Sequence, residues 1–386
     1  MGSVRWGAAA LAAVALVSAP GCASRSPLLV GDPATMDIAG LVDSEPAQRL
    51  LADILHGRPA DTRLARRVPS PLSTDIGAAP GVPPHASLSR LARDVSADFA
   101  ALTFARAASA EADSRRVQAA FARYLRDREA VAERALRRRA GVYTVLFAPS
   151  WMYRSHPETG ADFGPQRRLL DRLGIANRLI QTGESASVED NAAVIAAEVR
   201  AAPRHGRALI LVSASKSGAE VALALSRLLE PGETAGVAAW LNIVGALGGS
   251  PLADAALRPP VSWIARGVFW LRGWDWAGLA SMATEPSRRR LDGAAIPDGI
   301  AVVNVVAVPV SGTVGPEVWL GYRMLREHGP NDGVVLLTDA VWPGGVTLPV
   351  LGPDHLYEPR RDEAHGVALL RAVDLAIRLR ADRGGR

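Results

Sequence analysis

Cysteine and lysine are almost absent from this chain. Among 386 residues there is one cysteine, Cys22, and one lysine, Lys216, while the other 43 of the 44 basic residues are arginine. A single cysteine excludes an intramolecular disulfide. Aromatic residues make up only 5% of the chain, and its net charge of +5 is spread along it, with no basic cluster interleaved with aromatics. This excludes a nucleic-acid interface. The hydrophobic content of 48% is enough for a buried core, so we expect a globular protein.

The N-terminal apolar stretch is too short to be a permanent membrane span. It runs from Gly7 to Val17, follows Arg5, and leads into small residues. Spanning a bilayer takes about 20 apolar residues, whereas a basic residue, a short apolar stretch and small residues form the layout of a secretory signal. We therefore interpret residues 1–21 as a signal peptide.

The only cysteine stands directly after this segment. Ala19-Pro20-Gly21-Cys22 resembles the lipobox of bacterial lipoproteins, in which the cysteine is diacylated and becomes the first residue. The resemblance implies that residues 22–42 are a lipidated cysteine and a tether, and that the partner is a membrane. It also implies a cell-envelope location, facing the periplasm or in the outer membrane if the host is Gram-negative. An ordinary free thiol is the alternative.

Residues 43–140 have helical periodicity and little strand signal. The periodicity predicts helices over Glu45–His56, Ser87–Ala108 and Ala110–Arg139. Residues 68–85, between the first two, are rich in proline, which indicates a loop. We therefore predict a helical N-terminal region.

After Gly141 short apolar runs alternate with amphipathic segments. This alternation is typical of βαβ units and predicts an α/β domain over residues 141–386 with a mostly parallel central sheet. The predicted strands are Val142–Ala148, Asn177–Gln181, Ala208–Val212, Val237–Val244, Ile300–Val310 and Val346–Leu351. The predicted helices are Gly164–Leu173, Val188–Ala201, Lys216–Leu229, Glu317–Glu327 and Ala364–Ala381.

The candidate nucleophile is Ser215. The strand Ala208–Val212 runs directly into Ser-Ala-Ser-Lys-Ser-Gly and then into a helix. Strand, tight turn and helix form a nucleophile elbow, in which the residues two before and two after the serine must be small. Ser213 and Ser217 meet that condition, although glycines usually stand there. Both are also alternative nucleophiles.

A second arrangement overlaps this turn. Ser213 and Lys216 spell Ser-x-x-Lys, which penicillin-binding enzymes use to let a lysine activate a serine. Those enzymes also need a Lys-Thr-Gly triplet on a strand. Because the chain has one lysine, that triplet is excluded. The role of the Lys216 side chain stays open; a solvated side chain is the ordinary expectation.

The candidate base is His355. It lies in Gly-Pro-Asp-His-Leu between the last predicted strand and the last predicted helix. A serine nucleophile needs a neutral histidine within hydrogen-bond reach, and the chain order serine, acid, histidine places the base here. His365, at the start of the last helix, is the alternative.

The candidate acid is Asp332. It stands in an Asn-Asp-Gly turn 23 residues before His355, where its carboxylate can orient the histidine and stabilise the imidazolium. An aspartate in such a bend can also be a simple turn residue. Asp339 and Asp254 are the alternative acids.

Ser-Ala-Ser-Lys-Ser-Gly, Asn-Asp-Gly-Val-Val and Gly-Pro-Asp-His-Leu, in that order, resemble the esterase and lipase branches of the α/β-hydrolase superfamily. The resemblance covers about residues 140–386. It implies an α/β-hydrolase fold and an oxyanion hole formed by two backbone N–H groups. By position these belong to Trp151, after the first core strand, and to Lys216, after the nucleophile.

More than fifty residues separate the predicted strands that end near Val244 and begin near Ile300. Pro259 and Pro260 introduce an aromatic-rich stretch in this segment. The length and composition of residues 245–299 therefore predict a helical insertion over the active site. It is either a lid that forms an acyl-chain pocket or senses a lipid interface, or a cap packed as core. The candidate lid or pocket residues are Trp263, Phe269, Trp270, Trp274 and Trp276.

Together these features predict a membrane-anchored serine hydrolase that cleaves carboxylic esters through an acyl-serine intermediate. We expect no metal and no cofactor, and a small-molecule or lipid ester with an apolar portion as substrate. An acyltransferase with the same triad and a non-catalytic envelope scaffold on the same fold are the two alternatives.

Overall fold

The computed structural model describes residues 28–29, 36–58, 81–126, 130–202, 206–358 and 362–384. The predicted signal peptide, Cys22 and most of the tether lie outside these residues, as does most of the proline-rich loop. Within the described ranges, no helix combines the length and apolarity needed to cross a membrane.

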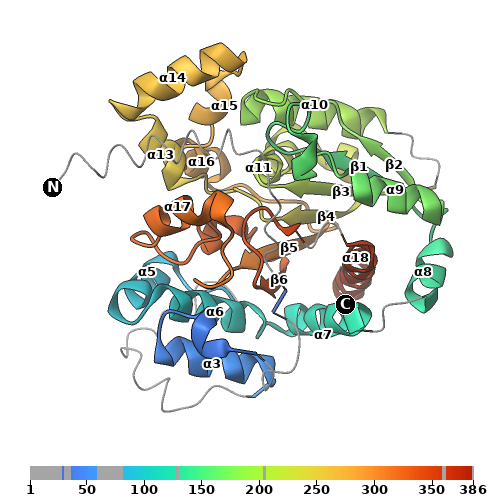
Figure 1. Ribbon diagram of the computed structural model, residues 1–386. Coiled ribbons are helices and arrows are strands. Elements are labelled where there is room, and N and C mark those ends of the chain that lie inside the picture. Colours follow the sequence, from blue (N-terminus) through green and yellow to red (C-terminus); the bar gives the residue numbers. More distant parts are fainter. Residues whose placement is uncertain are drawn as a thin grey trace.

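A six-stranded, entirely parallel sheet forms the centre of the molecule, with the order β2-β1-β3-β4-β5-β6 (Figure 1). The predicted α/β class with a mostly parallel central sheet is confirmed. β2 lies on one side of β1, whereas β3 to β6 follow in order on its other side, so the strand order changes direction between β1 and β3. In open α/β sheets, ligand sites lie at the carboxyl ends of the strands next to such a change in strand order. The strands are β1 (Tyr143–Ala148), β2 (Ala176–Leu179), β3 (Ala208–Ala214), β4 (Val237–Ile243), β5 (Ala301–Val308) and β6 (Val346–Leu351).

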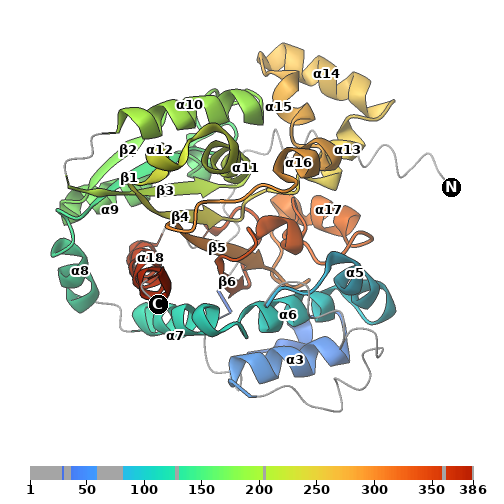
Figure 2. The same ribbon diagram turned by 180° about the vertical axis from the view of Figure 1, so that it is seen from behind.

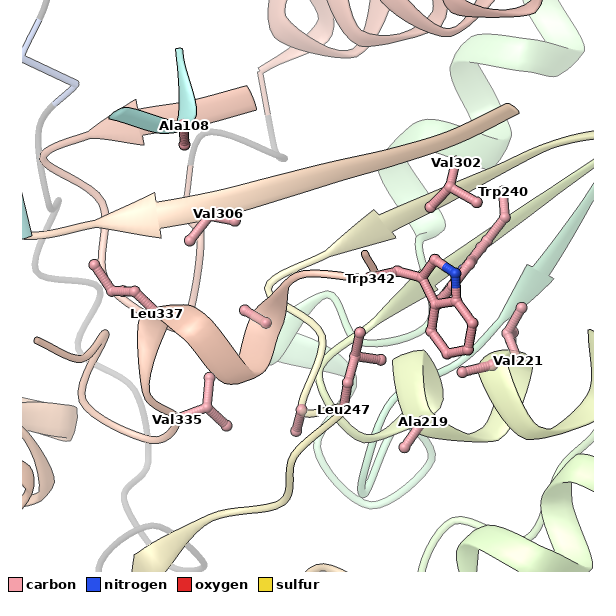
Figure 3. Close-up of a cluster of buried hydrophobic side chains, with 14 of the residues drawn as sticks. Ala108, Ala219, Val221, Trp240, Leu247, Val302, Val306, Val335, Leu337 and Trp342 are labelled. Atoms are coloured by element: carbon pink, nitrogen blue, oxygen red, sulfur yellow. The ribbon is translucent and has the colours of Figure 1, made fainter. Parts of the chain in front are cut away.

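Both faces of the sheet are buried, which is why its strands read as nearly continuous apolar runs. In β3, Leu209 and Leu211 enter one hydrophobic core, whereas Ile210 and Val212 enter the other. Figure 3 shows part of the first core, in which the rings of Trp240 and Trp342 lie edge to face with centroids 6.0 Å apart. Alternation along each strand thus supplies two cores at once.

Helices cover the two faces of the sheet (Figures 1 and 2). The first core is completed by α10 and α11, and the second by α9 and α18. The bounds of α9, α10 and α18 agree with the predicted helices to within a few residues. The predicted helix Lys216–Leu229 is α-helical only to Leu223 and continues as a π-helical turn, Ala224–Leu228. The helices are α9 (Gly164–Leu173), α10 (Val188–Ala201), α11 (Lys216–Leu223), α12 (Pro231–Thr234), α17 (Pro316–Leu325) and α18 (Glu363–Gly384).

The predicted helical insertion lies between β4 and β5. Four helices form it, and α14 is the outermost of them in both views (Figures 1 and 2). We call this segment the cap. Its helices are α13 (Pro251–Ala256), α14 (Val261–Arg272), α15 (Trp276–Ala280) and α16 (Thr284–Leu291).

The N-terminal region is helical as predicted, but one of its helix predictions is wrong. Ser87–Ala108 is two helices, because Ser96 is extended and its side chain accepts a hydrogen bond from Phe99 N, which starts a new helix. The predicted helix Ala110–Arg139 is helical over Ala112–Arg126 and Ala130–Arg137, and residues 127–129 lie outside the described part. The helices are α2 (Ile38–Leu41), α3 (Glu45–Leu55), α5 (His85–Asp94), α6 (Ala97–Ala108), α7 (Ala112–Arg126) and α8 (Ala130–Arg137).

This region covers the open edge of the sheet at β6. The Gln118 side chain donates to Pro349 O at 3.2 Å, Ser114 Oγ accepts from Thr347 N at 3.0 Å, and Leu29 N donates to the last residue of β6 at 3.0 Å. An uncovered edge strand would expose unpaired backbone groups to other chains. Because the N-terminal helices also contribute to both cores, they belong to the same folded unit as the sheet.

Candidate active site

The turn after β3 is strained at Ser215. Its φ of 53° and ψ of −124° lie in a region that non-glycine residues rarely adopt, at a cost of about 1–3 kcal/mol. The turn brings the first turn of α11 against the end of β4. A Cβ on Gly218 would lie 2.7 Å from Asn242 Oδ1 and 2.8 Å from Gly245 Cα. Glycine at 218 is therefore required by this close approach, a constraint that the sequence reasoning assigned to Ser213 and Ser217 alone.

The two neighbouring serines are held in the protein interior. Ser213 Oγ accepts a hydrogen bond from the Trp240 indole at 2.8 Å. Ser217 Oγ donates to Ala148 O at 2.8 Å, tying α11 to the end of β1. Both side chains are fully buried, whereas Ser215 is partly accessible. Of the three candidate serines, Ser215 is the one whose hydroxyl reaches the proposed base.

Ser215, His355 and Asp332 form a continuous hydrogen-bonded chain. Ser215 Oγ lies 2.7 Å from His355 Nε2, and His355 Nδ1 lies 2.7 Å from Asp332 Oδ2. The serine and histidine are 140 residues apart in the sequence. The carboxylate is 1% exposed and the imidazole 7%, so solvent competes little for these contacts. The structure thus brings together the three residues predicted as nucleophile, base and acid.

Backbone groups hold the acid in place. Asp332 Oδ1 accepts hydrogen bonds from Val334 N at 3.0 Å and Val335 N at 2.8 Å, while Asp332 O accepts from His355 N at 2.9 Å. These donors leave Oδ2 facing the imidazole. The carboxylate therefore favours one tautomer of the histidine, in which Nδ1 carries the proton and Nε2 can accept one.

A second buried carboxylate, Asp354, anchors the loop that carries the histidine. Its Oδ2 accepts from Gly315 N at 2.8 Å, after β5, and its Oδ1 accepts from Leu356 N at 3.0 Å. Sequence reasoning missed this residue. The available signal was an aspartate directly before the candidate histidine and directly after a Gly-Pro turn.

The alternative acids and base have other partners. His365 is fully buried in the core, and its Nε2 lies 2.8 Å from Tyr357 Oη. Burial lowers the pKa of His365 to about 4. Asp254 accepts hydrogen bonds from Thr284 at the start of α16, and Asp339 pairs with Arg288 at 3.7 Å. Each of these three side chains is engaged away from Ser215.

The two predicted oxyanion donors border the same cavity as the triad. Trp151 lies in a turn after β1, and Lys216 is the first residue of α11. Within the described ranges neither backbone N–H has a hydrogen-bond partner. The positive end of the helix dipole adds to the field at Lys216. The arrangement can therefore stabilise an anion beside Ser215 Oγ.

The Lys216 side chain is buried, so the expectation of a solvated lysine is wrong. Its ammonium pairs with Glu220 one turn along α11, and both side chains are at most 3% exposed. Glu220 Oε1 also accepts from Asn191 Nδ2 at 2.8 Å. Burial raises the pKa of the Glu220 carboxyl, and the nearby cation opposes that rise. Because α11 is buried on all sides, the long side chain has to find its partner inside the protein.

A cavity of about 260 Å³ opens beside the triad. It lies between the elbow, the loop after β1 and the inner side of the cap. Ser215 and His355 lie in its wall, and the rest of the wall is mostly apolar. Its large apolar residues are Trp151, Met152, Leu252, Val268, Phe269, Leu279, Met282, Val334, Val335 and Leu356.

The five aromatic residues proposed for the cap occupy three kinds of place. Phe269 lines the cavity. Trp274 and Trp276 pack behind it, with ring centroids 5.6 and 5.4 Å from its own. None of the four tryptophans lines the cavity, which corrects their assignment to the pocket. Trp263 and Trp270 are 70% and 83% exposed on the outer face of α14.

No protein-family model matches the chain, and no curated protein matches it. Several solved structures resemble part of it. The metagenomic carboxyl esterase MGS0156 is 23% identical, with a TM-score of 0.49, over 62% of this chain and 76% of that one. The mature form of the Bacillus licheniformis lipase BlEst2 is 21% identical, with a TM-score of 0.49, over 59% and 91%. Esterase B from Lactobacillus rhamnosis with a bound C6-C4 SN3 inhibitor is 14% identical, with a TM-score of 0.38, over 64% and 80%.

These likenesses are distant. In the part of the chain that the structure describes, no group of three or more His, Cys, Asp or Glu side chains is placed to hold a metal ion.

Proposed function

We propose that the protein is a serine hydrolase that cleaves carboxylic esters through an acyl-serine intermediate. The observation that carries the proposal is the chain from Asp332 through His355 to Ser215, with two contacts of 2.7 Å at a strained elbow. Strain and buried hydrogen bonds of this kind persist where the surrounding structure over-determines them, which is typical of catalytic sites.

The reaction follows from this geometry. His355 Nε2 takes the Ser215 proton as Oγ attacks the ester carbon, and the backbone N–H groups of Trp151 and Lys216 stabilise the resulting oxyanion. One such donor contributes about 3 kcal/mol of transition-state stabilisation. The imidazolium, stabilised by Asp332, then protonates the departing alcohol. Water, deprotonated by His355, attacks the acyl-serine and releases the acid.

The cavity wall supports a substrate with an apolar portion. Among the described residues that line the cavity, Lys216 is the only lysine, arginine, aspartate or glutamate, and its ammonium is paired with Glu220. A charged acyl or alcohol group would lose its hydration there without gaining a counterion. An uncharged small-molecule or lipid ester therefore fits best.

The central experiment compares Ser215→Ala with Ser150→Ala. Both serines line the cavity, but only Ser215 contacts His355. We expect Ser215→Ala to abolish turnover of p-nitrophenyl esters and labelling by a fluorophosphonate, and Ser150→Ala to retain both. Labelling of Ser215→Ala at the wild-type rate would contradict the proposal.

Two alternatives use the same fold. A non-catalytic scaffold needs no contact between His355 and Ser215, so the 2.7 Å separation favours an enzyme. An acyltransferase shares every step up to the acyl-serine and differs in the nucleophile that removes the acyl group. Product analysis with added alcohols distinguishes the two: free acid alone supports the hydrolase, and transfer to the alcohol in preference to water supports the acyltransferase.

The N-terminal sequence supports a second proposal, that acylated Cys22 anchors the protein in the cell envelope. The anchor would hold it facing the periplasm or in the outer membrane if the host is Gram-negative. Mass spectrometry of the N-terminal peptide tests this. We expect a peptide that begins at Cys22 and carries acyl chains, and its loss in Cys22→Ser; an unmodified thiol would contradict the proposal.

A further inference from the structure

The outer face of α14 is apolar and open to solvent. Trp263, Ile264, Trp270 and Leu271 are 70%, 54%, 83% and 76% exposed. They are four of the seven large hydrophobic residues that are exposed in the described part of the chain. Spacings of one, seven and eight residues place them on one face of the helix. We call these four residues the outer stripe.

The opposite face of the same helix is also apolar. Ala265, Val268 and Phe269 line the cavity beside the triad. A cap helix needs one apolar face to pack on the protein, and this inner face serves that purpose. The outer stripe is therefore not explained by folding, and an exposed apolar patch of this kind marks a surface for another partner.

Unpaired arginines flank the outer stripe. Residues 257–274 contain three arginines and no acidic residue. Within the described ranges, no ion pair is formed by Arg258, Arg266 or Arg272. The Arg266 guanidinium lies 4.5 Å from the Trp276 ring centroid, and that of Arg272 lies 5.4 Å from the Trp274 centroid. These two rings are buried or half-buried, so the contacts hold the guanidinium groups on the cap. Cations next to an exposed apolar stripe are complementary to anionic headgroups over an acyl layer.

We infer that the outer stripe of α14 docks on a membrane surface that contains anionic phospholipid. Tryptophan prefers the headgroup level of a bilayer, where its ring is buried and its N–H is hydrated. Docking there would hold the cavity under α14 close to the bilayer. A second copy of the chain fits less well, because a symmetric contact would bring two sets of unpaired arginines together. The inference requires neither ester hydrolysis nor acylation of Cys22.

The absence of cysteines beyond Cys22 allows a local test. In the full chain with Cys22→Ser, a single cysteine at position 263, 270 or 319 is labelled with bimane. Trp319 is the matched control, because it is an exposed tryptophan on α17, outside the cap. With vesicles of phosphatidylcholine and phosphatidylglycerol, we expect labels at 263 and 270 to shift to the blue and lose quenching by iodide, and the label at 319 to stay unchanged.

A second measurement uses vesicle sedimentation of the same Cys22→Ser chain. We expect the double variant Trp263→Ser, Trp270→Ser to lower the partition coefficient at least about tenfold. The reason is that burying one tryptophan side chain in the bilayer interface contributes more than about 1.4 kcal/mol, which corresponds to a tenfold change. We expect Trp319→Ser to change the partition coefficient little. Melting curves by circular dichroism check that all variants are folded.

Three results would overturn the inference. If iodide still quenches the labels at 263 and 270 when the protein is bound to vesicles, the outer stripe is not at the membrane. An equal response to vesicles of pure phosphatidylcholine would show that docking does not depend on anionic phospholipid. Protection that rises with protein concentration without lipid would assign the stripe to a second copy.

Discussion

His365 offers a direct test of how the core is built. Its imidazole lies between Phe121, at a centroid distance of 5.3 Å, and Tyr357 Oη, 2.8 Å from Nε2. Burial lowers the pKa of His365 from 6.5 to about 4, so the folded protein keeps this side chain neutral in mild acid. In the unfolded chain the same side chain is hydrated and takes up a proton below about pH 6.5.

The sign and size of the effect follow from this difference. A pKa lower in the folded state gives stability that is fully present above 6.5 and is lost as the pH falls towards 4. Each pKa unit is worth about 1.4 kcal/mol, so the free energy of unfolding should fall by about 3 kcal/mol over this interval. Burial raises the pKa of Asp98, Glu220 and Asp339, and these groups act in the opposite direction. The effect of His365 must therefore be measured as a difference.

The perturbation is His365→Phe together with Tyr357→Phe, which removes both partners of the buried hydrogen bond and leaves neither unsatisfied. Urea unfolding at about pH 7 and about pH 4.5 gives the free energy of unfolding of each protein. We expect wild type to lose about 2–3 kcal/mol more than the variant over this interval. The exposed His56, replaced by Gln, is the control and should follow wild type. Equal losses of unfolding free energy in wild type and the double variant would refute the conclusion that the His365 imidazole is buried and neutral in the folded protein.

Three further predictions concern other buried charges. Asp332→Asn should lower kcat for a p-nitrophenyl ester roughly a thousandfold or more, because the imidazole loses its tautomer and its counterion; a loss below tenfold would argue against Asp332 as the acid. Lys216→Met leaves Glu220 buried without a cation and should lower the free energy of unfolding by about 3 kcal/mol or more in urea, with recovery on adding Glu220→Gln. Asp98→Ala leaves hydrogen-bond donors on Asp43, Ser311 and Tyr322 without an acceptor and should lower the free energy of unfolding by about 3 kcal/mol in the same assay. A decrease below about 1 kcal/mol would show that these hydrogen bonds do not hold the N-terminal helices to the sheet.

Strands were predictable because both faces of this sheet are buried. In Ala301–Val308 every residue is buried, so the strand appears in the sequence as an apolar run in which Asn304 is the one polar residue. Helix limits were less predictable. The apolar periodicity continues through Val95 and Ser96, and only the capping hydrogen bond to Phe99 N shows that a new helix begins there.

The cap shows a different limit of sequence reasoning. Tryptophans gathered over residues 263–276 predicted a helical insertion, and the insertion is helical. Composition could not tell which of these aromatic residues face the cavity, because α14 is apolar on both sides. The exposure of Trp263 and Trp270 depends on how the whole helix is oriented over the sheet.

The strand–turn–helix at Ser215 and the order of serine, acid and histidine could be read from local sequence, since each lies within a few residues of a strand end. Which histidine reaches the serine depends on packing between residues 140 apart in the sequence. His355 lies in the loop after β6, whereas His365 lies on α18 and is buried against Tyr357. The buried pairing of Lys216 likewise follows from the packing around α11. Periodicity along the chain is a local property and sets which faces are apolar. Which residues contact one another across those faces depends on long-range packing. In this chain, that packing determines which of the candidate residues come together at the site.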